Sequence, residues 1–287
     1  MKPAPFTYHR ARDTEDAVRL LAELGDEAKL IAGGQSLVAM MNFRLARPSH
    51  LVDIGRLRDL AFVHRTPVGG LRIGALTTHH TVEMADEATL GPEFAVLRDA
   101  MRWIGHLPIR TRGTVGGSIA HGDATAEWCL LAVLLDADLV ATGPRGTRKI
   151  AAAEFFHGFF TTALDPDEML VEIVFPRPAP HAALTEFAER QGDFATAAAA
   201  VDLDLSHGRV SGGRIALGGV AAVPVRVPEA EAVLARGGEP GSGLFAECAR
   251  VTAAAVDPPG DANASANYRR SLIRTLVEQA LEQAVNR

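Results

Sequence analysis

The chain has 287 residues, of which 47% are hydrophobic and 22% charged, which is typical of a soluble globular protein with one or two domains. Its formal net charge of −6 argues against nucleic acid as the main partner, because binding to phosphates needs a basic surface. No segment approaches the roughly 20 uncharged apolar residues that cross a bilayer, and the N-terminus does not resemble a signal peptide. We therefore expect a cytoplasmic protein without a membrane span.

The chain contains only two cysteines, Cys129 and Cys248, and they are far apart in sequence. They match no metal-ligand motif and exclude a disulfide framework as the main source of stability. An iron–sulfur cluster normally needs about four thiolates, which this chain cannot supply. If the protein takes part in electron transfer through such clusters, they must lie on another chain.

Helical and strand-like segments alternate in the first half of the chain. Asp13 or Thr14 can cap a helix that ends at Gly25, and a strand is expected over residues 29–32. Further elements follow in chain order: an apolar stretch over 37–45, strands at 51–54 and 71–73, a helix starting near 77–78, a longer helix over 92–104, a helix over 126–135, and strands at 139–141 and 170–175.

A proline-rich segment at 176–180 is the best candidate for a linker, because its three prolines cannot continue a helix or a central strand. We place a domain boundary there, with a first domain over 1–176 and an α+β domain over 177–287. The second domain is expected to contain a long hairpin, with tight packing at its Ala197–Ala200 run, and then three helices. These elements are placed at 194–205 and 208–220 for the hairpin, and at 229–235, 245–255 and 266–285 for the helices.

Two glycine pairs occur where a ligand could approach the main chain. Ala32–Ser36 follows a predicted strand, and Thr114–Ser118 lies just before Asp123 and Glu127. Consecutive amides in such turns can form concave nests for phosphate oxygens, so two nests would suit a diphosphate; ordinary structural turns are the alternative. The P-loop motif and the Rossmann G-x-G-x-x-G motif are both missing from the sequence.

These segments resemble a known family. Residues 29–45 and 109–123 resemble the first and second FAD motifs of the FAD-binding medium subunits of molybdenum hydroxylases, the xanthine dehydrogenase and carbon monoxide dehydrogenase family, and 192–197 resembles a third signature. The resemblance implies an α+β fold: a vanillyl-alcohol-oxidase (PCMH)-type FAD-binding domain of two subdomains, followed by a smaller α+β C-terminal domain.

The resemblance also implies which residues bind FAD. Main-chain amides and hydroxyls of two segments would hold the diphosphate and the ribityl chain, with Lys29 near the nucleotide end. The complete set of implied FAD contacts is Lys29, Ala32, Gly33, Gly34, Gln35, Ser36, Leu37, Ile104, Thr114, Val115, Gly116, Gly117, Ser118, Asp123, Glu127, Met169 and Leu170.

At the flavin end, Ile104 would pack on the isoalloxazine ring. Glu127 or Asp123 would accept hydrogen bonds from ribityl or ribose hydroxyls, and Met169 and Leu170 would line the adenine or flavin pocket.

The sequence departs from the family pattern at two places. Ser118 stands where many relatives carry asparagine. A lysine that some relatives place near the flavin pyrimidine edge corresponds to Thr185 or Glu186. Which group stabilises N1 of the reduced flavin therefore stays open.

The function implied by the resemblance is electron transfer without substrate chemistry on this chain. FAD would take electrons from two [2Fe–2S] clusters of a small partner subunit and deliver them to an external acceptor such as NAD, a quinone or oxygen. A large partner subunit would carry the molybdenum–pterin cofactor, in an (LMS)2 heterohexamer. The substrate stays open among carbon monoxide, an aldehyde and an N-heteroaromatic compound.

Two other functions are weighed against this one. A free-standing FAD-dependent oxidase of the same fold would need a base beside flavin N5, and no arrangement of His, Tyr or Cys offers one convincingly. A scaffold subunit that has lost its flavin is the second alternative. Bound FAD in the purified chain would exclude the scaffold.

Several single residues allow more than one interpretation. His79 and His80 are adjacent and would make a poor chelate on a strand, so we expect no metal site. Phe194 is expected in the core, although in the family an aromatic residue there lies close to the flavin. Three arginines could face the phosphates or a partner subunit: Arg44, Arg110 and Arg112.

Overall fold

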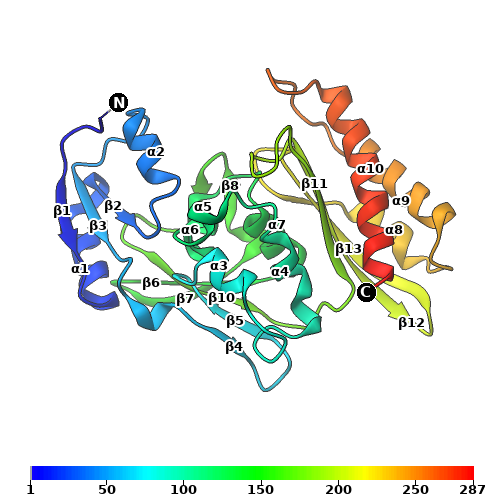
Figure 1. Ribbon diagram of the computed structural model, residues 1–287, viewed down its shortest axis with the longest axis horizontal. Helices are drawn as coiled ribbons and strands as arrows, with labels where there is room; N and C mark the ends of the chain where they lie inside the picture. Colours follow the sequence, from blue (N-terminus) through cyan, green and yellow to red (C-terminus); the bar gives the residue numbers. More distant parts are fainter. Residues whose placement is uncertain (1) are drawn as a thin grey trace.

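Three main β-sheets lie side by side along the molecule in the computed structural model, which describes residues 2–287 (Figure 1). We call them the N-terminal, central and C-terminal sheets. Their strand orders are β1-β3-β2, β4-β5-β10-β6-β7 and β11-β12-β13-β14, and β8 (Phe156–Gly158) with β9 (Thr161–Thr162) forms a small additional pair. Between the central and C-terminal sheets lies a helical layer, so the chain has the expected α+β character.

The N-terminal sheet is parallel and is covered by α1 (Thr14–Leu24). The predicted start of this helix is confirmed, because the Asp13 side chain accepts a hydrogen bond from the main-chain N–H of Asp16. Gly25 ends the helix at a φ of 59°. The sheet consists of β1 (Thr7–Arg10), β2 (Ala28–Ile31) and β3 (His50–Asp53), and α2 (Leu37–Asn42) follows β2.

The central sheet is antiparallel and carries short helices on one side. Its strands are β4 (Val63–Arg65), β5 (Leu71–Gly74), β6 (Asp138–Gly143), β7 (Gly146–Ala151) and β10 (Met169–Phe175). The helices are α3 (His79–Glu83), α4 (Ala95–Ala100), α5 (Leu107–Arg110), α6 (Val115–His121) and α7 (Glu127–Leu134). The single helix predicted over 92–104 is wrong, because α4 ends at Ala100 and the chain turns before α5.

Successive side chains along the strands of the C-terminal sheet point to opposite faces, and both faces are buried. Even-numbered residues such as Ala198 and Ala200 belong to the core shared with the central sheet, whereas Ala197 and Ala199 belong to the core formed with the C-terminal helices. The tight packing predicted for this run is confirmed. The elements are β11 (Ala182–Phe187), β12 (Ala197–Ser206), β13 (Arg209–Gly218), β14 (Val225–Arg226), α8 (Pro228–Ala235), α9 (Ser242–Ala255) and α10 (Ala266–Val285).

Helix α7 joins the two halves of the molecule. All eight of its residues are buried, and it packs against β12 and β13 of the C-terminal sheet (Figure 1). Apart from Glu127 at its first position, α7 is apolar all round, as expected of a helix in an interior, so it fixes the C-terminal sheet to the central layer.

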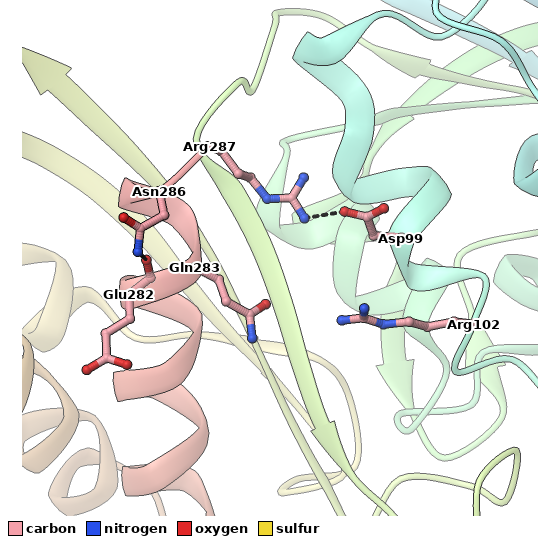
Figure 2. A pocket seen from close by; sticks show the side chains of 6 residues that line it. All are labelled: Asp99, Arg102, Glu282, Gln283, Asn286 and Arg287. Carbon is pink, nitrogen blue, oxygen red and sulfur yellow. Dashed lines mark hydrogen bonds and ion pairs between the residues drawn. The ribbon is translucent and has the colours of Figure 1, made fainter.

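The end of the chain returns to the same layer. Arg287, after α10, makes an ion pair with Asp99 of α4, as Figure 2 shows. A hollow of about 540 Å³ lies between α10 and α4 and is lined by Asp99, Arg102, Glu282, Gln283, Asn286 and Arg287. Of the helices within residues 2–287, none combines the length and the apolarity needed to cross a membrane.

Candidate cofactor site

The turn between β2 and α2 has four unused main-chain donors in a row. Within residues 2–287, the N–H groups of Gly33, Gly34, Gln35 and Ser36 donate to no acceptor. The side chain of Gln35 stabilises the turn, because its amide nitrogen donates to the carbonyl of Gly33 at 2.9 Å. Gly34 has a φ of 72°, in the left-handed region that glycine adopts without strain. Consecutive free donors of this kind can bind an anion such as a phosphate.

The turn at Thr114–Ser118 is built differently. The N–H groups of Val115 and Gly116 donate to the carbonyls of Thr77 and Ala75, at 2.9 and 2.8 Å. The N–H of Gly117 donates to the Thr114 hydroxyl at 3.1 Å, which caps α6, and the N–H of Ser118 donates to the Thr114 carbonyl. This turn therefore differs from the second nest that the sequence predicts. Its amides hold the turn in place, which leaves the hydroxyls of Thr114 and Ser118 as its remaining donors.

The first turn is nevertheless in direct contact with Arg112 and Gly113, which belong to the second motif (109–123) and directly precede the Thr114–Ser118 turn. A methyl group added at Gly33 would lie 2.1 Å from the carbonyl oxygen of Arg112 and 2.9 Å from Cα of Gly113. Contact this close between two main chains is possible only without a side chain. The first turn therefore sits against the segment that leads into the second, so the two motifs are in contact.

A buried pair of aromatic rings supports this contact from below. A methyl group at Gly113 would lie 2.8 Å from Nε2 of His79, whose other ring nitrogen accepts a hydrogen bond from Nε1 of Trp128 at 3.0 Å. Both residues are buried and their rings are stacked. Burial, and then the nearby charge of Arg110, lowers the pKa of His79 to about 4, so the ring is neutral at physiological pH.

His79 should therefore contribute to the loss of stability in acid. A histidine whose pKa falls on folding stabilises the native state above its unfolded pKa of about 6.5, and this contribution is lost as the pH falls towards 4. Since one pKa unit corresponds to about 1.4 kcal/mol, we expect His79→Gln to reduce the acid-induced loss by about 2–3 kcal/mol between pH 7.5 and 4.5. Urea unfolding at both pH values measures it.

The exposed His64 is the matched control, since His64→Gln should leave the acid-induced loss unchanged. If His79→Gln and wild type lose equal free energy of unfolding over this range, the neutral buried histidine is not the acid-sensitive group.

Ile104, which the resemblance implies to pack on the isoalloxazine ring, lies in a loop that is held by hydrogen bonds from Arg110. Ile104 is half-buried, and the carbonyls of Ile104 and Gly105 accept hydrogen bonds from Nη1 of Arg110, at 3.2 and 3.1 Å. Nε of Arg110 donates to the carboxylate of Glu83 at 2.9 Å, which lowers the pKa of that carboxyl. The sequence leaves two roles open for Arg110, contact with the phosphates or with a partner subunit. Its hydrogen bonds within the chain explain its position without either contact. Its side chain joins this loop to α3 through these hydrogen bonds.

The two candidate acidic residues differ in what their side chains do. Asp123 is half-buried and accepts hydrogen bonds from the N–H and the hydroxyl of Thr125, at 2.9 and 2.7 Å, so it stabilises its own turn. Glu127 is only 9% exposed, at the first residue of α7. Burial, with a smaller contribution from the charge of Asp123, raises the pKa of Glu127 to about 7.

The remaining predicted contacts lie around these turns. Lys29 is exposed on β2, directly before the first turn. Met169 and Leu170 begin β10 and are buried, Met169 in the core of the N-terminal sheet and Leu170 in the central core. With 1% and 5% of their surface exposed, both side chains pack within these cores. Of the arginines, Arg44 donates to the main-chain carbonyl of Lys2, and Arg112 has an exposed side chain.

Thr185 and Glu186 point to opposite faces of the C-terminal sheet. The Thr185 hydroxyl donates to the carbonyl of Leu276 at 2.8 Å, so it faces α10. Glu186 lies on the opposite face, towards the central layer. The core position predicted for Phe194 is wrong, because its side chain is 76% exposed.

No candidate metal site emerges from the described part of the chain. Residues 2–287 contain no group of three or more His, Cys, Asp or Glu side chains placed to hold a metal ion. His79 and His80 lie in α3 and not on a strand: His79 is buried beneath Gly113, and His80 pairs with Glu83. Cys129 and Cys248 are both buried and unpaired.

Comparison with known families covers almost the whole chain. The family model described as "FAD binding domain in molybdopterin dehydrogenase" matches residues 4–178. A second, described as "CO dehydrogenase flavoprotein C-terminal domain", matches residues 182–284. The first includes both turns, and the second begins at β11.

Similar proteins extend over the full length. The chain is 41% identical to the 6-hydroxypseudooxynicotine dehydrogenase complex subunit alpha of Paenarthrobacter nicotinovorans, covering 100% of this chain and 97% of that protein. It is 36% identical to the carbon monoxide dehydrogenase medium chain of Afipia carboxidovorans, with 99% and 98% covered. A solved structure of reconstituted CO dehydrogenase from Oligotropha carboxidovorans superposes with a TM-score of 0.94 at 35% identity over 100% of both chains. The chain therefore belongs to the family of FAD-binding subunits of molybdenum hydroxylases, which are oxidoreductases.

Proposed function

We propose that this chain binds FAD with its diphosphate on the Gly33–Ser36 turn and passes electrons from a partner's iron–sulfur clusters to an external acceptor. The observation that carries the proposal is the row of four free N–H groups, set directly against the backbone of Arg112 and Gly113. A diphosphate carries the negative oxygens that such donors bind. When bound, FAD supplies the electron-accepting chemistry, and the protein supplies binding, orientation and electrostatics.

The residues of the chain divide this work among them. The first turn binds the phosphates through its amides, and the hydroxyls of Thr114 and Ser118 are the donors that the second turn contributes. Glu127 would accept hydrogen bonds from sugar or ribityl hydroxyls, and Ile104 would form the shelf for the ring. Nη1 of Arg110 donates to the carbonyls of both Ile104 and Gly105. The shelf is therefore held in place before FAD binds.

Exposed apolar side chains support an assembly with partner subunits. Phe43 and Leu45 follow α2, and Phe159 and Phe160 lie between β8 and β9; all four are largely exposed. Exposed apolar clusters often mark protein–protein contacts. The partners that we propose are a large subunit with the molybdenum–pterin cofactor and a small subunit with two [2Fe–2S] clusters, in an (LMS)2 heterohexamer in the cytoplasm.

The test is a comparison of the chain expressed alone and with its two partners. We expect the purified chain to bind one FAD, measured by absorption and by chromatography of the released cofactor. Small alcohols should leave the flavin of the isolated chain oxidised, whereas the substrate of the complex should reduce it only when both partners are present. A chain without FAD would contradict the proposal, and reduction by an alcohol in the isolated chain would favour the free-standing oxidase.

A further inference from the structure

A buried arginine near the start of α10 connects three segments that are far apart in sequence. Arg269 is only 5% exposed, and its Nη1 donates to the main-chain carbonyls of Thr196 and Gly219, to the latter at 3.0 Å. Its Nη2 donates to the carboxylate of Asp261 at 2.6 Å. A buried charge is costly unless it is paired and hydrogen-bonded, so these three partners explain how the guanidinium is accommodated.

The two carbonyls belong to loops at the same end of the β12–β13 hairpin. Thr196 directly precedes β12 and Gly219 directly follows β13, where Ala198 pairs with Gly218. Gly219 has a φ of 73°, and a methyl group there would lie 3.1 Å from the carbonyl oxygen of Ala195 and 3.2 Å from that of Thr196. The absence of a side chain lets the two loops approach each other, and the guanidinium joins them from the side of α10.

The Gly219 loop supports the turn before α7. The N–H of Gly219 donates to the carbonyl of Ala124 at 2.9 Å. Ala124 follows Asp123 and lies three residues before Glu127, which would accept hydrogen bonds from FAD hydroxyls under the proposed function. The guanidinium therefore acts on this side of the cofactor site through one intervening residue.

The Thr196 loop reaches the loop of Ile104. Gly192 lies four residues before Thr196, and a methyl group on it would lie 2.8 Å from the carbonyl oxygen of Gly105. The segment between them is thus held at both ends, by contact with Gly105 and by the guanidinium. Phe194 in its middle is 76% exposed, so its own packing does not fix the segment. The position of the segment depends on its two ends.

The next residue of α10 shows that these contacts are particular to one arginine. Arg270 pairs with the exposed Asp257 and with Asn267 of its own helix. It contacts neither loop of the sheet within the hydrogen bonds of residues 2–287. A planar guanidinium can hold several acceptors in one fixed arrangement, and Arg269 does so with main-chain groups of two loops.

We propose that Arg269 is a positioning residue for the flavin site, which fixes the Thr196 and Gly219 loops and, through them, the Phe194 segment and the turn at Ala124. This inference rests on the proposed function. It assigns to α10 a residue that acts on bound FAD without touching it. Removal of the guanidinium takes a charged donor away from both carbonyls, so the two loops lose their common anchor.

The test compares the flavin of the full-length chain with that of variants in α10, with FAD as the probe. In Arg269→Gln the FAD dissociation constant should rise about tenfold, which corresponds to about 1.4 kcal/mol. At saturating FAD, the visible circular dichroism of the flavin should also change, because both loops shift relative to the ring. Arg269→Lys keeps the positive charge and three donors, so it should lie closer to wild type in both measurements.

Two substitutions in the same helix are the controls. Ile273→Ala, one turn later, removes a fully buried side chain and lowers stability without taking a hydrogen bond from either loop. Arg274→Gln removes an exposed arginine that makes no ion pair within residues 2–287. Measured at a temperature at which urea unfolding shows each variant to be folded, both should match wild type in FAD affinity and flavin dichroism.

Asp261→Asn is the second variant in case Arg269→Gln does not fold. It removes the ion pair with Nη2 and keeps the oxygen that accepts from the N–H groups of Asn263 and Ala264. The FAD dissociation constant and the flavin dichroism should change in the same direction as in Arg269→Gln, by a smaller amount.

The outcomes separate this inference from the proposed function. The positioning role is wrong if Arg269→Gln, or Asp261→Asn in its place, binds FAD as wild type does with unchanged dichroism. It is also wrong if Ile273→Ala changes both measurements as much as Arg269→Gln, since the effect then follows stability alone. In each of these cases the chain is still an FAD subunit. If wild type binds no FAD, the proposed function itself fails.

Discussion

Gly33→Ala is expected to weaken FAD binding by about tenfold to hundredfold, since each 1.4 kcal/mol changes a dissociation constant tenfold and an overpacked contact costs about 1–3 kcal/mol. The added methyl group would lie 2.1 Å from the carbonyl oxygen of Arg112, which is main chain and cannot move as a side chain would. The turn must separate from Arg112 and Gly113, and its four donors would lose their alignment. Titration of FAD against the apo chain, followed by flavin fluorescence, measures the effect.

Gly243→Ala is the matched control for this substitution. Gly243 lies in α9, and no atom stands within 4 Å of an added methyl group. Since alanine is the better helix former, the variant should bind FAD normally and be slightly more stable. Equal FAD affinity of Gly33→Ala and Gly243→Ala would show that contact between the two turns is not needed for binding.

Arg110→Gln should release the loop that carries Ile104. The substitution leaves the carbonyls of Ile104 and Gly105 and the carboxylate of Glu83 without their shared donor. Loss of hydrogen bonds to a charged group of this kind costs about 1.5–3 kcal/mol. We expect the free energy of unfolding to fall by about that amount and FAD affinity to fall about tenfold. Urea unfolding, FAD titration and limited proteolysis of the loop measure the three consequences.

Arg58→Gln is a suitable control, because Arg58 is exposed and makes no ion pair within residues 2–287. It should leave all three measurements unchanged. If FAD affinity is retained in Arg110→Gln while the loop becomes sensitive to protease, the shelf does not contribute to flavin binding and Ile104 loses its proposed role.

Elements with strong local signals could be predicted from the sequence. The cap at Asp13 and the glycine stop at Gly25 define α1, and the long hairpin of β12 and β13 follows from alternation around a tight turn. Strand β11 was not predicted, because it places Thr185 and Glu186 at buried positions, and their polarity hides the pattern. Tertiary contacts decide these positions: α10 supplies an acceptor for Thr185.

The candidate site was predictable in its location but not in its internal bonding. Glycine pairs and the family motifs indicate both turns. Which amides remain free depends on distant carbonyls, those of Ala75 and Thr77, which no local pattern reveals. The position of Arg110 depends in the same way on Glu83, whose carboxylate lies 27 residues earlier in the chain and accepts from its Nε. Phe194 was misplaced because an aromatic residue next to a strand usually packs inward, whereas here it lies before the strand begins.

The four alanines at the start of β12 have a mechanical consequence. Their methyl groups are buried on both faces of the sheet, against the central layer on one side and the C-terminal helices on the other. Close-packed small side chains resist sliding, because any shift opens voids or creates clashes on both faces. The layers should thus move as one rigid body, and under the proposed function a redox partner docked on either layer would lie at a constant distance from FAD.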